Sequence, residues 1–291
     1  TFSDDTLKFD GNSISKDEPK GKIICKRATT LHTEKCTQTD GSMFCSGAGY
    51  TASGSKGTST ITYGNLGTKG SLNSGDAFDC DVNGDGEYNS DTERFYYVSD
   101  YYNASTKLFE SDTAVLIYYN NVNLGNPNNN TKSSYDSSGE NWHGPRTAIE
   151  QLPTTSQWNN VSLKNISRTI LNENSSNITT GGTLPNKFSY EGYSSRLITI
   201  QEVRKAAHND NIPIWKVGEL DDYNYFVENT SFSSPNGRNL AYWLETPCSD
   251  SSSFAFGVYG HNRNVGSNDV PHLGVYSVRP AIEVSKTNIE Y

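Results

Sequence analysis

Between Asp79 and Asp91 an oxygen-bearing side chain stands at almost every second position around a glycine, and no other stretch constrains the chain more. From Asp81 the segment reads D-x-N-x-D-G-x-x-N-x-D. Side-chain oxygens at loop positions 1, 3, 5 and 9, with glycine at position 6 for a sharp turn, are what a hard cation such as Ca²⁺ requires. We therefore predict a calcium loop whose candidate ligands are Asp81, Asn83, Asp85, Glu87, Asn89 and Asp91.

The loop does not fit a complete EF-hand. Position 12, where an EF-hand carries glutamate, is Thr92, with Asp91 and Glu93 on either side. The residues that follow, 94–98, have the aromatic and β-branched character of a strand instead of an exiting helix. A metal-free turn remains the alternative, because Asp, Asn and Gly also favour left-handed turn geometry. Since the loop adjoins Cys80 and a predicted core strand, we expect its ion to be structural.

Composition favours strands and long polar loops. Only 33% of the 291 residues are apolar, but 11% are aromatic and 18 are tyrosine. Such a core is built from Tyr, Phe, Trp, Ile and Val among many polar residues. The net charge of −9 argues against nucleic acid or an anionic membrane as a partner. No run of apolar residues is long enough to span a bilayer, so we expect no membrane insertion by this segment.

The five cysteines suggest an oxidising compartment. They stand at positions 25, 36, 45, 80 and 248, without the C-x-x-C pairs of a zinc site. One or two disulfides in an exported protein are expected, with free thiols in a cytosolic chain as the alternative, and any four cysteines allow three pairings. Because the chain begins at Thr1 without Met, we expect an export or anchoring segment outside this sequence. Together with calcium, this indicates a secreted or cell-surface protein.

Strand patterns precede and follow a helical region, which predicts one α+β domain. Residues 1–20 form a polar lead-in, and 21–291 form a single domain with a Cys-rich and calcium-loop elaboration at its N-terminal side. The Thr199-to-Glu202 spacing predicts a capping box that opens a helix. Strands are expected at 23–25, 58–63, 94–99, 113–119, 242–245, 254–259 and 275–284, helices at 145–152, 202–208 and 221–228, a hairpin connection at 100–103, and a loop too polar to bury at 120–140.

Three short motifs in this order resemble a known series. They are Arg196 to Val203 (R-L-I-T-I-Q-E-V), Tyr242 to Pro247 (Y-W-L-E-T-P) and Val278 to Ala281 (V-R-P-A). The order is similar to C-type-lectin-like domains of bacterial and phage proteins, including formylglycine-generating-enzyme-like domains, the variable proteins of diversity-generating retroelements and a family in bacterial surface proteins. The resemblance covers roughly residues 90 to 284. It implies a C-type-lectin-like fold with mixed and antiparallel sheets, a few short helices and long polar loops.

The resemblance also implies a solvent-facing ligand surface near the C-terminal end, which can be diversified in such proteins. In this sequence it would lie between Ser251 and Tyr276, where aromatic, Asn, His and Arg side chains resemble those of recognition surfaces. Alternation leaves open that the phenylalanines there form the core face of a strand. The candidate ligand-binding residues are Phe254, Phe256, Tyr259, His261, Asn262, Arg263, Asn264, Asn268, His272 and Tyr276.

Catalytic patterns are absent from the sequence. It has no H-E-x-x-H, no G-x-S-x-G and no phosphate-binding glycine loop. The formylglycine-generating enzymes in the series that the motifs resemble work through a cysteine-based copper site, but Cys248 is the only cysteine near the end of this chain, so that chemistry is not supported. His143 is the only histidine in a distinctive setting. We therefore expect a non-catalytic extracellular adhesion or recognition protein with an unidentified protein or glycan ligand. The alternatives are a secreted glycan-acting hydrolase, for which the four tryptophans could stack on sugars, and a structural pilus-like surface subunit.

Overall fold

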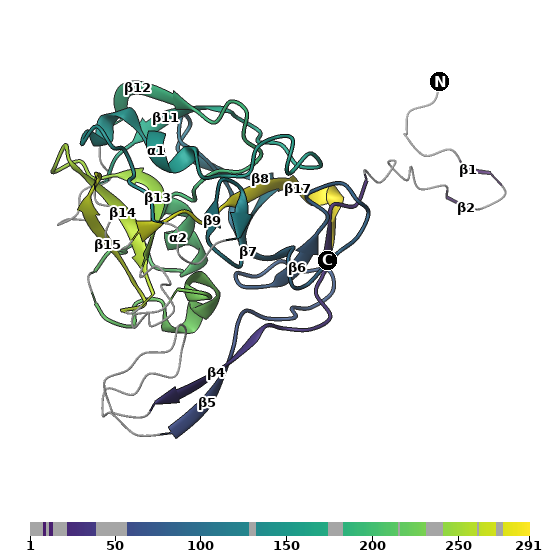
Figure 1. Ribbon diagram of the computed structural model, residues 1–291. Helices are drawn as coiled ribbons and strands as arrows, with labels where there is room; N and C mark the ends of the chain where they lie inside the picture. Colours follow the sequence, from purple (N-terminus) through teal and green to yellow (C-terminus); the bar gives the residue numbers. More distant parts are fainter. Residues whose placement is uncertain are drawn as a thin grey trace.

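The computed structural model describes residues 8–9, 12–13, 22–38, 57–127, 132–173, 183–214, 216–230, 241–260, 262–271 and 276–291. Within these ranges strands outnumber helices and every helix is short, so the expectation of an α+β protein is confirmed (Figure 1). No helix in the described part of the chain combines the length and hydropathy that crossing a bilayer needs.

A six-stranded sheet forms the centre of the molecule. Neighbouring strands are antiparallel, except that the strand closest to the C-terminus, which forms one edge of the sheet, runs parallel to its neighbour. In spatial order the strands are β17 (Ala281–Ser285), β8 (Leu108–Tyr118), β7 (Arg94–Asn103), β6 (Ala77–Cys80), β3 (Cys25–Arg27) and β18 (Ile289–Glu290).

The central strand β7 is buried on both faces. Phe95 and Tyr97 pack into one hydrophobic cluster, whereas Tyr96 and Val98 pack into the other. Successive side chains of a strand point to opposite faces, so a strand covered on both sides needs apolar residues at consecutive positions. The run of aromatic residues from 95 to 97 meets that need.

A four-stranded sheet packs beside the central one. Trp243 is fully buried on its strand β13, and its ring stacks on Tyr276 at 3.8 Å between centroids. The strand order is β15 (Asn264–Asp269), β14 (Phe254–Tyr259), β13 (Ala241–Pro247) and β16 (Tyr276–Ser277).

The remaining described strands form four two-stranded pairs. They join β1 (Lys8–Phe9) to β2 (Asn12–Ser13), β4 (Thr33–Gln38) to β5 (Gly57–Thr62), β9 (Val122–Asn123) to β10 (Asn126–Pro127), and β11 (Ser167–Leu171) to β12 (Thr183–Ser189).

Helix α2 (Ile200–Ala206) begins as the sequence predicts. The Thr199 hydroxyl accepts the backbone N–H of Glu202, and the Glu202 carboxylate accepts the N–H of Thr199, which completes the capping box. The remaining helices are η1 (Asn141–His143), α1 (Arg146–Ile149), η2 (Asp221–Val227) and η3 (Lys286–Asn288).

A buried ionic network fixes α2 against the sheets. The Arg196 guanidinium is fully buried and donates to both oxygens of Glu202, at 2.6 and 2.9 Å. Its Nε donates to Glu283 on β17 at 2.5 Å. Arg168 on β11 pairs with Glu245 on β13 at 3.2 Å. Because buried charges are tolerated only when paired and hydrogen-bonded, the network fixes the relative positions of four elements.

Three sequence expectations are wrong in detail. Residues 100–103 do not connect a hairpin, because β7 continues through Asn103 and the turn to β8 lies at 104–107. The strand expected at 275–284 is divided: β16 joins the four-stranded sheet and β17 joins the central one. In the polar stretch 120–140, Ser133 and Tyr135 are buried, because Ser133 O accepts the indole N–H of Trp243 and the Tyr135 hydroxyl donates to Glu245 O.

The structure shows the state of three of the five cysteines. Cys25 on β3 and Cys80 on β6 form a disulfide, which confirms one of the expected cross-links, and Cys248 is a buried free thiol. Only the backbone of Cys36 is described, and Cys45 lies outside the described residues.

Candidate metal centre

The predicted calcium loop connects β6 to β7, and its own polar side chains fold it. The Asn83 side-chain oxygen accepts the Asp85 N–H at 3.0 Å, and Asp85 Oδ1 accepts the Glu87 N–H at 2.8 Å. Gly86 has a φ of +86°, which L-residues rarely adopt, and its N–H donates to Asp81 Oδ2 at 3.2 Å. The turn therefore directs the Asp81 and Asp85 side chains to the same side of the loop.

Three carboxylates meet at this point. One oxygen each from Asp81, Asp85 and Glu93 lies within 4.8 Å of the other two, so the group could hold a metal ion. Asp81 is fully buried, Glu93 is 4% exposed and Asp85 is exposed. Like charges at this separation repel one another unless a proton or a cation neutralises them.

Two oxygens of the group have no hydrogen-bond partner. Asp81 Oδ1 and Glu93 Oε1 are both buried and accept no donor. Buried polar atoms in native proteins are almost always paired, so an unpaired carboxylate oxygen needs an explanation. A cation held between the carboxylates would satisfy both oxygens.

The electrostatics of Glu93 agree with this interpretation. Burial raises the pKa of Glu93 to about 7, and the charges of Asp85 and Asp81 add to the increase, while the hydrogen bond from the Asn89 N–H opposes it. The nearest described cation is Lys22, whose ammonium lies 3.6 Å from Asp81 Oδ2 but is 61% exposed. One solvated lysine is a weak counter-charge for three carboxylates.

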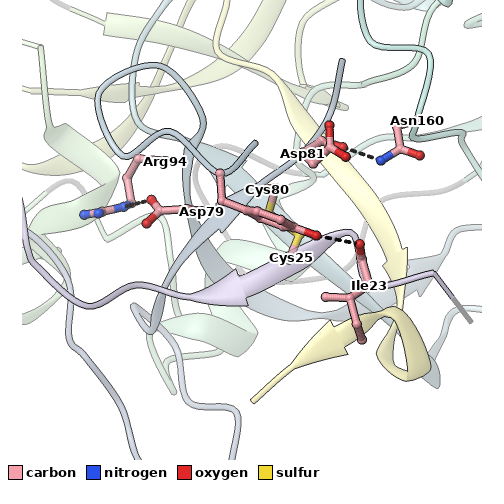
Figure 2. Close-up of a disulfide and its surroundings, with 8 residues drawn as sticks. Ile23, Cys25, Asp79, Cys80, Asp81, Arg94 and Asn160 are labelled. Carbon is pink, nitrogen blue, oxygen red and sulfur yellow. Dashed lines mark hydrogen bonds and ion pairs between the residues drawn. A yellow bond between two sulfur atoms is a disulfide. The ribbon is translucent and has the colours of Figure 1, made fainter. Parts of the chain in front are cut away.

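The elements around Cys80 hold the first ligand in place (Figure 2). The Cys25–Cys80 disulfide fixes the residue before Asp81, and the Asp81 backbone accepts a hydrogen bond from Asn160 at 2.5 Å and donates one to Ile24 O at 2.9 Å. Arg94 and Asp79 form an ion pair at 2.7 Å across the base of the loop, between β7 and β6. The backbone of Asp81 is therefore held by the adjacent disulfide and by hydrogen bonds from two separate segments, and this positions its carboxylate.

The structure brings together two of the six candidate ligands and adds one that the prediction did not include. Asp81 and Asp85 belong to the group, whereas Glu87 and Asp91 do not, and the amide oxygens of Asn83 and Asn89 accept backbone N–H groups. Glu93 is the missed residue. Its position, one beyond the EF-hand glutamate, was the available signal.

The candidate ligand surface near the C-terminus lies partly in the core. Phe256, Arg263, Asn264 and Tyr276 are buried, so these four side chains do not face solvent. Burial corrects the predicted exposure of Arg263, Asn264 and Tyr276, and for Phe256 it agrees with the alternative of a core-facing strand residue. Phe256 alternates into a core cluster, and Arg263 pairs with Asp221 at 2.9 Å. Phe254, Tyr259, Asn262 and Asn268 are half-buried, and His261 and His272 lie outside the described residues. A ligand-binding role for this segment stays a prediction.

His143 and His32 both pair with buried carboxylates. His143 Nδ1 lies 2.7 Å from Asp136 Oδ2, and the Ser138 hydroxyl lies 3.0 Å from the same nitrogen. A serine triad needs the hydroxyl on the opposite ring nitrogen, so this arrangement does not match one. His32 Nδ1 lies 2.6 Å from Glu228, in the wall of a 480 Å³ hollow that Ser90 and Asp91 of the loop also line.

The tryptophans predominantly support the core. Trp158 and Trp243 are buried, Trp142 is 39% exposed beside His143, and Trp215 lies outside the described residues. They therefore do not form one shared platform within the described part of the chain. No family model matches the sequence, and no curated protein or solved structure matches it either.

Proposed function

We propose that the protein is a non-catalytic recognition domain that acts outside the cell and whose fold is stabilised by a calcium ion. The main support for a bound metal is that Asp81 and Glu93 each have a buried oxygen without a hydrogen-bond partner, and both lie in one group with the Asp85 carboxylate. The ion is a structural staple between the end of β6 and the start of β7. In this position it holds a loop that has few apolar contacts of its own.

Calcium fits the donor set better than the other common metals. The group contains carboxylate oxygens only, without the thiolate or imidazole that zinc, copper or iron prefer. Magnesium demands near-ideal octahedral geometry, whereas calcium accepts six to eight oxygens in flexible arrangements that include backbone carbonyls and water. A loop that supplies three carboxylates of unequal exposure suits the more tolerant ion.

The disulfide supports an extracellular location. Disulfides persist in oxidising compartments and are rare in the cytosol. Calcium loops with millimolar to submillimolar affinity are likewise typical of extracellular modules. A covalent cross-link at Cys80 directly before a metal ligand at Asp81 combines both features in two consecutive residues.

A C-type-lectin-like fold is the architecture we propose for this domain. Its support is that the three motifs carrying the resemblance have structural roles: Arg196 and Glu202 form the buried ion pair, Trp243 stacks in the core, and Arg279 donates to the carbonyls of Tyr225 and Phe226. Recognition in such a domain falls to its loops, which rigid sheets position.

Thermal unfolding with and without calcium tests the proposal. Calcium at about one hundred times its Kd adds roughly 2.7 kcal/mol of stability, which corresponds to an increase in Tm of about 5–10 °C for a chain of this size. Glu93→Gln and Asp81→Asn should abolish the increase. Glu87→Gln is the matched control, because Glu87 belongs to the same loop, is exposed and lies outside the group.

Two outcomes would contradict the proposal that a calcium ion stabilises this loop. If a calcium chelator leaves the Tm of the wild type unchanged, the loop is a metal-free turn. If magnesium raises the Tm as much as calcium does at equal concentration, the site does not distinguish the two ions and the assignment to calcium fails.

A further inference from the structure

A hollow of about 670 Å³ lies where α1 meets the β11–β12 pair, away from the metal centre. Figure 1 places these elements together at the top of the molecule, whereas β6 and the C-terminus lie lower, towards the right. Its volume is within the range of small-molecule sites. Neither the metal ligands nor the candidate C-terminal surface lines it.

Two cations on its rim lack anionic partners. Arg146 on α1 and Lys187 on β12 are exposed, and neither is paired with a carboxylate in the described ranges. Every other arginine in these ranges donates to a carboxylate or a carbonyl: Arg27, Arg94, Arg168, Arg196, Arg204, Arg263 and Arg279. In a chain with a net charge of −9, an arginine and a lysine left free around one hollow form a local site for an anion.

The remaining lining is suited to hydroxyl groups and to a small apolar face. Ser167 and Ser189 are direct cross-strand partners, so both hydroxyls lie on one face of the β11–β12 pair. The Glu150 carboxylate can only accept hydrogen bonds, and it would repel a second anionic group near it. Ile149 and Phe188 are buried beneath the rim, and the ring of Tyr193 is half-buried.

We propose that this hollow binds a small acidic sugar. The ligand carboxylate lies between Arg146 and Lys187, its hydroxyl groups bond to Ser167, Ser189 and Glu150, and its C–H face packs on the Tyr193 ring. A simple anion would make no hydrogen bonds to Glu150, Ser167 and Ser189. An apolar carboxylate would have no hydroxyl group to offer these three residues. This inference rests on the proposed recognition function, for which it names the ligand class.

Ligand titration of the full chain in the presence of calcium tests the inference, with D-glucuronate, D-glucose, benzoate and acetate as probes. Glucuronate should bind most tightly, and glucose, which lacks the carboxylate, should bind about ten-fold more weakly. Arg146→Gln and Lys187→Gln should each weaken glucuronate binding by about ten-fold and leave glucose binding unchanged. Lys69→Gln removes an exposed lysine that does not line the hollow, and it should have no effect.

Three results would overturn the inference. Equal binding of acetate would reduce the site to a general anion site, and equal binding of benzoate would show that the hydroxyl partners are unused. Unchanged glucuronate binding in both cation variants would place the ligand elsewhere. The calcium-induced increase in Tm, measured on the same variants, separates this test from that of the metal centre: Arg146→Gln should retain the increase, and Asp81→Asn should lose it.

Discussion

At the scale of single residues, Glu228 collects two short hydrogen bonds beside the calcium loop. Its carboxylate accepts from the Tyr96 hydroxyl at 2.6 Å and lies 2.6 Å from His32 Nδ1, while His32 Nε2 lies 2.7 Å from Ser90 O. Burial lowers the pKa of His32, but the hydrogen bond and the charge of Glu228 outweigh it, and the net pKa is raised above 6.5. His32 therefore connects the segment before β4 to the segment before β13 and to the loop.

This pair gives a pH dependence with a defined sign. A histidine whose folded pKa is raised stabilises the protein fully below its unfolded pKa of about 6.5, and this contribution is lost as the pH rises through the folded value. We expect His32→Gln to lower the free energy of unfolding more at pH 6 than at pH 9. Urea unfolding of both proteins at the two pH values measures the difference. An equal loss at both pH values would mean that the imidazole is not charged.

At the scale of elements, α2 depends on one hydroxyl at its start. The Thr199 hydroxyl accepts a hydrogen bond from the N–H of Glu202. The Glu202 carboxylate in turn accepts hydrogen bonds from both terminal nitrogens of Arg196. Thr199→Ala should cost about 1 kcal/mol of stability, the usual cost of losing an N-cap. Thr199→Ser keeps the hydroxyl and should cost less. Chemical denaturation of the two variants checks this order, and a reversed order would show that the Thr199 methyl group matters more than the cap.

The elements also show what sequence patterns can and cannot predict. The β14 boundaries, the capping box at Thr199 and the strand character of 94–98 follow from local periodicity and hydrogen-bonding chemistry, and the structure confirms them. Local chemistry cannot reveal that Ser133 is buried, because Trp243 and Tyr276, which bond to its backbone, are more than one hundred residues away in the chain.

The same reasoning explains the outcome at the two candidate sites. Asp81 and Asp85 were predictable because a loop of fixed spacing brings them together, whereas Glu93 belongs to the beginning of the next strand. The burial of Phe256 and Tyr276 depends on which face of the four-stranded sheet meets the core, and alternation alone leaves that choice open. The residues that line the hollow at Arg146 and Lys187 come from segments about forty residues apart, and no sequence motif marks them.

At the scale of the whole molecule, one covalent bond closes a large loop. Cys25 and Cys80 are 55 positions apart. In the entropic model, closing a loop of this length lowers the entropy of the unfolded chain and so stabilises the folded protein by about 4 kcal/mol. The double variant Cys25→Ser/Cys80→Ser should lose roughly this much stability and should also bind calcium more weakly, since Asp81 follows Cys80 directly. Unfolding and calcium titration of the double variant measure both effects. Unaltered calcium affinity would mean that the loop positions Asp81 without the disulfide.

The parallel pairing of β18 with β3 determines how the molecule carries a mechanical load. Ile289 pairs with Cys25 and Glu290 with Lys26, so the described chain enters and leaves the central sheet at adjacent strands. Tension applied between residue 22 and the C-terminus would slide these two strands along each other, which strains their hydrogen bonds together instead of one at a time. The disulfide transfers the same tension from β3 to β6. The residues between the two cysteines, which include the β4–β5 pair, therefore cannot be drawn out by a pull on the ends while that bond is intact.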